Sequence, residues 1–218
     1  MKNGFVYAPT ADPVEVIHAD DDILVVNKPA DLLSVPGKAP EHRDCLETRL
    51  REVYPDTLLV HRLDMATSGV MVFARNKAAQ RHLGMQFEKR QTRKVYVARV
   101  WGDVADDSGL VDLPLIVDWP NKPKQKVCFE AGKPSQTRWE VIARDGETTR
   151  MRLFPLTGRT HQLRVHMLAL GHPILGDRFY AQGAAFAAAG RMLLHAKELA
   201  FRHPTGGADV AFSSEVPF

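Results

Sequence analysis

A continuous apolar stretch, Val70-Met71-Val72-Phe73-Ala74, directly follows the polar stretch His61-Arg62-Leu63-Asp64-Met65-Ala66-Thr67-Ser68-Gly69. An apolar run of this length after turn residues is typical of a buried strand. Asp64 therefore lies on a turn leading into the core, where a rigid scaffold can hold a side chain while its head stays accessible. Two interpretations follow: Asp64 takes part in chemistry, or it caps the turn or pairs with Arg62 on a surface loop.

The predicted elements indicate an α+β fold. Strands are expected at residues 14–18, 23–27, 70–74, 94–100, 136–143 and 149–154. Helices are expected from an N-cap at Asp44 to about Tyr54, over residues 77–90, and from an N-cap at Thr160 to a C-cap at Gly171. Residues 118–126 are expected to be irregular, and residues 181–189 to form a short helix or a loop. Because strands outnumber helices without alternating with them, a mixed, mostly antiparallel sheet is favoured over a doubly wound parallel one.

Positive charge is concentrated in three segments. Residues 75–99 carry eight Lys or Arg against one acid, a local net of +7 in a chain whose total is +3. Residues 119–138 add five basic side chains against Glu130, and residues 150–166 carry four arginines with no acid. One basic run usually marks a solvated helix face. Three runs with Tyr96 and Trp119 among them favour a polyanion that needs phosphate contacts and stacking surfaces, which points to nucleic acid.

A metal site is disfavoured by the histidine spacing. His161 and His166 are five residues apart, so on a helix they are separated by about 140° and cannot share a ligand face. His61 and Asp64 could supply two ligands, but no third ligand is placed by spacing. Cys45 and Cys128 are isolated, which suggests neither a disulfide framework nor a zinc knuckle and makes a reducing cytoplasm the default.

Phosphate-binding and hydrolase motifs are also missing. Gly132-Lys133 is followed by Pro134 and lacks the upstream glycine of a P-loop. Ser68 lies in Thr-Ser-Gly rather than in the Gly-x-Ser-x-Gly of a nucleophile elbow. No Gly-x-Gly-x-x-Gly occurs. The sequence therefore predicts a site without cofactor or metal, whose reactive groups are Asp, Arg and Tyr.

Five motifs in order carry a resemblance to a known family. The stretch 61–69 resembles the catalytic signature of RNA pseudouridine synthases of the large-subunit-rRNA type. The other four are Val25-Val26-Asn27-Lys28-Pro29, Lys94-Val95-Tyr96-Val97-Ala98, Leu156 to His166, and Gly171-His172-Pro173-Ile174-Leu175-Gly176-Asp177. Residues 114–128 and the pair Met65-Ala66 are most similar to the short members that modify both 23S rRNA and tRNA. The resemblance implies the α+β fold of that family, with helices and loops around an active-site cleft.

The resemblance also implies an activity, the isomerisation of uridine to pseudouridine in structured RNA. Asp64 would be the nucleophile, or would stabilise an electron-poor sugar. Arg164 would pair with Asp64, keep it ionised and orient it. Tyr96 would stack on the target uracil, the alternative being a core strand residue with its hydroxyl at the rim. Independently of the resemblance, Arg62 lies two residues before Asp64 in an extended loop and could project the same way. We therefore expect it to fill the position vacated by the flipped base, the alternatives being a phosphate contact or a structural ion pair.

Further expectations concern partners and organisation. The RNA-binding side chains are expected to be Arg62, His61, Thr67, Lys94, Lys122, Lys124, Lys126 and Arg159. The RNA partners are expected to be 23S rRNA and the tRNA anticodon stem-loop, with no membrane and no metal. Residues 1–218 are expected to form one catalytic domain, without a separate N-terminal RNA-binding domain, and to act as a cytoplasmic monomer. The alternatives are an RNA-binding or chaperone-like module without catalysis and, more distantly, a metal-dependent hydrolase.

Overall fold

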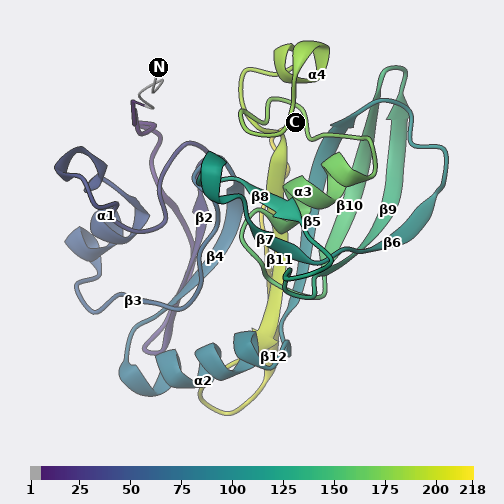
Figure 1. The fold of residues 1–218 in the computed structure, drawn as a ribbon. Helices are drawn as coiled ribbons and strands as arrows, with labels where there is room; N and C mark the ends of the chain where they lie inside the picture. The colour runs from purple at the N-terminus through teal and green to yellow at the C-terminus, as the bar shows by residue number, and fades with distance from the viewer. Residues whose placement is uncertain (1–5) are drawn as a thin grey trace. The chain divides into compact units, whose positions relative to one another are not determined.

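The computed structural model describes residues 6–218, in which the apolar stretch after Asp64 forms β4 (Ser68–Ala74), with all seven residues buried. The described chain divides into two compact units. Figure 1 labels helices and strands of both. Unit 1 contains the described residues up to Thr92 together with Leu199–Ser214. Unit 2 contains Arg93–Glu198 and Glu215–Phe218, so β11 (Leu194–Arg202) has residues in both units.

Unit 1 is a small antiparallel sheet with helices. Its elements are β1 (Glu15–Ala19), β2 (Ile23–Lys28), a 3-10 turn (Pro40–His42), α1 (Leu46–Val53), β3 (Leu58–Leu59), β4, α2 (Lys77–Glu88) and β12 (Asp209–Ser213). β2 lies between β1 and β4, and its register pairs Ile23 with Ala74 and Lys28 with Gly69. Ala79 and Leu83 of α2 belong to the same buried apolar cluster as Val72. The Asp64 loop thus leads into the most buried strand of this core, as the sequence predicts.

Unit 2 is also built on antiparallel strands, of which β7 and β8 form a separate two-stranded sheet. Its elements are β5 (Arg93–Trp101), β6 (Ser108–Asp112), β7 (Leu115–Val117), a 3-10 turn (Trp119–Asn121), β8 (Gln125–Val127), β9 (Gln136–Asp145), β10 (Thr148–Pro155), α3 (Gln162–Ala169) and α4 (Gly183–Ala187). β10 lies between β5 and β9, and β6 pairs with β9. Every strand register described within the two units is antiparallel, which fits the predicted α+β class with a mostly antiparallel sheet.

Two predicted helix caps are wrong by one residue. The N-cap of α1 is Cys45, whose sulfur accepts from Thr48 N, because both carboxylate oxygens of Asp44 are taken by Arg49. The N-cap of α3 is His161, with a left-handed φ of 54°, rather than Thr160. In the turn before α3, the backbone N–H of Arg159 donates to the side-chain oxygen of Gln162 at 3.0 Å.

The other end of α3 and the segment after β7 also differ from the prediction. The C-cap of α3 is Leu170; Gly171 lies one residue beyond it with a φ of 88°, a conformation that glycine adopts without steric cost. Residues 118–126, predicted to be irregular, include the 3-10 turn and the start of β8, because β8 pairs with β7. Over residues 6–218, no helix combines the length and apolar character needed to cross a membrane.

Candidate active site

Asp64 lies in unit 1, on the turn between β3 and β4. The turn is closed by a hydrogen bond from Thr67 N to the Asp64 carbonyl at 3.1 Å. Leu63 before Asp64 is buried, whereas Asp64 itself is half-buried and Arg62 is exposed. Thr67, predicted to bind RNA, is buried at the base of the turn. The loop therefore keeps an acidic and a basic side chain accessible at the edge of a fully buried strand.

The backbone on both sides of Asp64 is tethered, by Lys28 at the end of β2 and by Ser34 in the segment that follows β2. On one side, the Ser34 hydroxyl bonds to both Leu63 N and Leu63 O. On the other side, the ammonium group of Lys28 donates to Met65 O at 2.9 Å and also to Leu32 O and Pro29 O. Lys28 is fully buried, and a buried charge is tolerated only when polar partners satisfy it. Asp64 thus lies between two fixed peptide groups.

His61, at the start of the same loop, makes two contacts with neighbouring elements. Its Nε2 accepts a hydrogen bond from Val72 N at 3.1 Å, so this nitrogen carries no proton. The ring stacks on Phe87 of α2, with centroids 4.4 Å apart. His61 therefore ties the start of the loop to the middle of β4 and to α2, whatever contact it makes with RNA.

Arg164 lies in unit 2, on α3, and is almost completely buried. Its Nε and Nη2 donate to the two carboxylate oxygens of Asp177, each at 2.7 Å. Asp177 is fully buried and also accepts from the backbone N–H groups of Phe179 and Tyr180. The guanidinium lies over both of those rings, 5.2 and 5.1 Å from their centroids. A bidentate partner and two aromatic faces leave Arg164 a single orientation.

Tyr96 and Lys94 lie on one face of β5 in unit 2. Tyr96 is half-buried and pairs across the sheet with Leu153 of β10, while Val95 and Val97 point into the core. Lys94 donates to Thr157 O at 3.5 Å, near the loop that precedes α3. At the start of β5, the half-buried face is thus the one that carries Lys94 and Tyr96.

The histidines of α3 are internal hydrogen-bonding groups. Nδ1 of His166 lies 2.9 Å from the Thr137 hydroxyl, and its Nε2 lies 3.1 Å from Leu113 O. Burial lowers the pKa of His166 and outweighs the opposing effects of Leu113 O and the charge of Asp112. His161 Nδ1 bonds to the Tyr180 hydroxyl at 2.8 Å. Within the described chain, no three His, Cys, Asp or Glu side chains are grouped so that they could hold a metal ion.

Three of the predicted basic contacts of unit 2, Lys122, Lys124 and Lys126, belong to the β7–β8 hairpin. Lys124 and Lys126 line a cavity of about 770 Å³, and Lys126 is 3.7 Å from Asp118. The same cavity is lined by Trp101, Leu168, Phe179 and Tyr180. Lys122 Nζ lies 3.0 Å from the centroid of the exposed Trp119 ring. Arg159 donates from Nε to Pro134 O at 3.4 Å. Positive charge and aromatic surface thus occur together here.

Three residues that support the site were given no role from the sequence: Lys28, Ser34 and Asp177. Lys28 and Asp177 occur within motifs, but nothing in the sequence indicates that each is buried against a particular partner. Ser34 lies in a loop with proline and glycine, where a polar residue is ordinary. Asp64 belongs to unit 1, whereas Tyr96 and Arg164 belong to unit 2.

Comparison with known proteins gives consistent results. A family model described as RNA pseudouridylate synthase matches residues 22–169. The chain is 61% identical over 204 residues to a dual-specificity RNA pseudouridine synthase RluA of Vibrio vulnificus (strain CMCP6), covering 91% of this chain and 82% of that protein. It is 56% identical over 214 residues to the protein of the same name from Escherichia coli (strain K12), and the match covers 97% of this chain and 98% of that protein.

A solved structure supports the same assignment. Human RNA Pseudouridylate Synthase Domain Containing 1 matches with a TM-score of 0.79 and 31% identity, over 100% of this chain and 87% of that one. The family model, the curated relatives and this structure agree, and the range that the family model matches includes the Asp64 loop. The chain therefore belongs to the RNA pseudouridylate synthase family, and it is an isomerase that forms pseudouridine in RNA.

Proposed function

We propose that this isomerase modifies uridines in both 23S rRNA and the tRNA anticodon stem-loop. The support is its high identity, over most of both chains, to relatives named as dual-specificity enzymes. The observation that carries the catalytic assignment is the tethering of the Asp64 loop on both sides by Ser34 and Lys28. A carboxylate held so firmly at the edge of a buried strand is suited to a reaction that needs one fixed acidic group.

In the proposed reaction, the bond between C1′ and N1 of the uridine breaks and a bond between C1′ and C5 forms. N1 leaves with the bonding electron pair, the uracil turns, and C5 attacks C1′. C5 then loses its proton to a base, and N1 takes up a proton. Asp64 either bonds to C1′ between the two steps or stabilises the electron-poor sugar; a carboxylate is ionised at neutral pH and needs no helper base for either role.

Arg164 and Tyr96 complete the proposed chemistry. Arg164 would orient Asp64 and balance its charge, and its fixed orientation against Asp177 supports such a role. Tyr96, half-buried on β5, would stack on the uracil while the base turns. The target uridine must leave its stack before any of these groups can act on it, so base flipping is part of the proposal. Arg62, exposed two residues before Asp64, would occupy the vacated place in the RNA.

The remaining RNA contacts are proposed at basic side chains of both units. Lys122, Lys124 and Lys126 would contact phosphates beside the aromatic surface of the β7–β8 hairpin, and Lys94 and Arg159 would add contacts near the loop before α3. Phosphate contacts of this kind position the RNA without reading its sequence. We further propose that the enzyme works in the cytoplasm as a monomer.

The decisive experiment compares the parent enzyme with Asp64→Asn. The substrates are a 23S rRNA fragment and an anticodon stem-loop, each labelled with tritium at C5 of uridine. We expect the parent to release tritium from both RNAs, and Asp64→Asn to bind them with unchanged affinity but release none. Turnover by Asp64→Asn would overturn the catalytic assignment. Release from only one RNA by the parent would overturn the proposed dual specificity.

A further inference from the structure

The Ser34 hydroxyl bridges the two peptide groups of a single residue, Leu63. Leu63 N donates to Ser34 Oγ at 3.2 Å, and Ser34 Oγ donates to Leu63 O at 2.7 Å. Ser34 is only 4% exposed and Leu63 only 8% exposed, so water does not compete freely for these bonds. One hydroxyl thus satisfies the N–H and the C=O of the residue immediately before Asp64.

These two bonds restrict where the Asp64 side chain points. The carbonyl of Leu63 belongs to the peptide plane that ends at the Asp64 nitrogen, so fixing it fixes one side of the Asp64 α-carbon. On the other side of the α-carbon, Asp64 O accepts from Thr67 N at 3.1 Å, and Lys28 holds the next carbonyl group, Met65 O, at 2.9 Å. Little rotation of the backbone remains at Asp64 once both planes are held.

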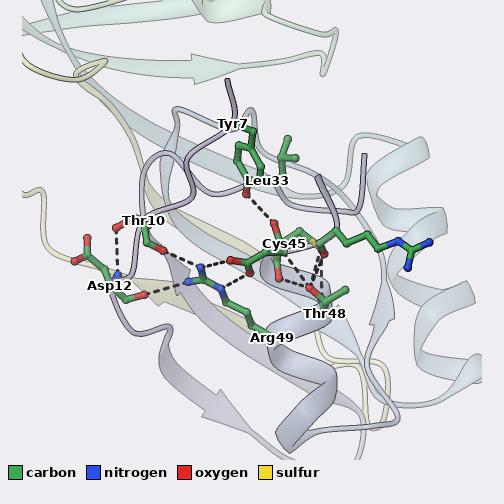
Figure 2. A network of polar contacts seen from close by, with 9 residues as sticks. Tyr7, Thr10, Asp12, Leu33, Cys45, Thr48 and Arg49 are labelled. Carbon is green, nitrogen blue, oxygen red and sulfur yellow. Dashed lines mark hydrogen bonds and ion pairs between the residues drawn. The ribbon is translucent and has the colours of Figure 1, made fainter. Parts of the chain in front are cut away.

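The loop that carries Ser34 is itself braced by the N-terminal segment (Figure 2). The Tyr7 hydroxyl accepts from Leu33 N at 3.0 Å and donates to Asp44 O at 2.8 Å. The segment after Tyr7 is fastened by Arg49, which donates to Thr10 O at 2.8 Å. Ser34 O also accepts from Glu47 N at 3.3 Å. The backbone of Ser34 is therefore held in place, and its hydroxyl in turn fixes the position of Leu63.

We propose that Ser34 is a positioning residue for Asp64, acting through the backbone of Leu63. The inference rests on the proposed role of Asp64. Ser34 would contribute to the rate of the chemical step rather than to RNA binding. A displacement of a reacting group by roughly 1 Å can cost about 100-fold in rate, so loss of the hydroxyl is expected to lower kcat by between about tenfold and 100-fold.

The structure offers a matched control in Thr149 of β10. Its hydroxyl is also fully buried and also bridges two backbone groups, accepting from Val104 N at 3.1 Å and donating to Gly102 O at 2.8 Å. Thr149→Val therefore removes the same kind of hydrogen bonds from unit 2, whereas Ser34 and the Asp64 loop belong to unit 1. Ser34→Ala and Thr149→Val should lower the urea midpoint of unfolding by similar amounts.

The experiment measures kcat and KM by tritium release for Ser34→Ala, Ser34→Cys and Thr149→Val. We expect kcat to fall in the order Ser, Cys, Ala at position 34, because the thiol makes weaker hydrogen bonds than the hydroxyl. KM should stay within about twofold of the parent in all three variants, and kcat should be unchanged in Thr149→Val. An unchanged kcat in Ser34→Ala, or an equal loss in Thr149→Val, would overturn the proposal.

Two further arms keep the outcome decisive. If Ser34→Ala does not fold at the assay temperature, Ser34→Cys alone decides, and a parental kcat in that variant would overturn the proposal. Asp64→Asn is run beside the others. If Asp64→Asn is inactive while Ser34→Ala turns over like the parent, only the role of Ser34 fails; if Asp64→Asn is active, the proposed function itself fails.

Discussion

The guanidinium of Arg164 and the carboxylate of Asp177 form a bidentate pair with two 2.7 Å hydrogen bonds, and both side chains are almost completely buried. Removing one partner of such a pair leaves a buried charge uncompensated, which typically costs about 3–5 kcal/mol. Because Asp177 also accepts two backbone N–H groups, its loss would loosen the start of the segment that carries Phe179 and Tyr180.

Replacing Asp177 by Asn should therefore lower the free energy of unfolding by about 3–5 kcal/mol and reduce turnover, because Arg164 loses its fixed orientation. Urea unfolding and tritium release measure the two effects. The matched control is Glu198→Gln, which breaks a 2.7 Å pair with Arg93, whose side chain is 69% exposed. That change should cost at most about 1 kcal/mol. Equal losses in the two variants would contradict the assignment of Arg164 as a rigidly held group.

Arg62 supplies a second prediction, since it is exposed two residues before Asp64. Arg62→Ala should lower conversion of a structured stem-loop far more than conversion of a short unstructured RNA, because only the stem-loop needs a flipped base to be replaced. Arg202→Ala, which removes an exposed arginine from β11, is the control and should affect both RNAs equally. If Arg62→Ala converts both RNAs as well as the parent does, Arg62 does not fill the place of the flipped base.

A third prediction concerns salt. If Lys124 contacts a phosphate, RNA affinity should fall steeply with salt, and Lys124→Gln should reduce the slope of log K against log salt by roughly 0.7 to 0.9. Filter binding at several salt concentrations measures the slope. Lys38→Gln changes an exposed lysine outside the three basic segments and should leave the slope unchanged. An unchanged slope in Lys124→Gln would remove the cavity beside β8 from the RNA footprint.

The fourth prediction is a pH dependence of stability. In unit 1, the carboxylate of Asp20 lies 2.7 Å from His18 Nε2 and 3.1 Å from His203 Nε2, and it accepts backbone hydrogen bonds from Asp22 and Ile23. Burial alone would raise the pKa of Asp20, but hydrogen bonds from His18, from the two backbone N–H groups and from His203 outweigh it and hold the pKa well below its usual value.

For His203, burial works to lower the pKa, but hydrogen bonds to Thr205 O and Asp20 and the charges of Asp20 and Asp22 raise it overall. A raised pKa stabilises the fold below the unfolded value of about 6.5, and this stability is lost as pH rises through the folded value. The parent should therefore exceed His203→Gln in unfolding free energy by more at pH 5.5 than at pH 8.5. If the difference in unfolding free energy between the parent and His203→Gln instead grows with pH, the prediction is wrong. Asp20 acts oppositely: its contribution is present above its unfolded pKa and lost only in strong acid.

The sequence predicts best those features that depend on local pattern. The buried strand at Val70–Ala74 and the amphipathic helix that begins at Lys77 follow from periodicity, and both occur in the structure. β8 was missed because its backbone bonds go to β7, a partner that the local composition does not reveal. The cap at Asp44 was wrong because Arg49 competes for the same carboxylate.

For the site, the sequence points to Asp64, Tyr96 and Arg164 but not to the residues that hold them. Asp177 meets Arg164 across 13 positions of chain, and Ser34 meets Leu63 across 29. Such pairings depend on the tertiary fold, so the position of a serine or an aspartate in the sequence does not indicate its partner. The supporting residues of a site are therefore the part that needs a structure.

The three tryptophans differ strongly in environment, which gives the protein an internal optical label. Trp139 is buried, whereas Trp119 is 69% exposed on the β7–β8 hairpin, under the ammonium group of Lys122. An RNA phosphate that draws Lys122 away, or a base that stacks on the indole, would change the emission of Trp119 while leaving that of Trp139 as it is. Association of RNA with this hairpin can thus be followed by intrinsic fluorescence, without attaching a dye to either molecule.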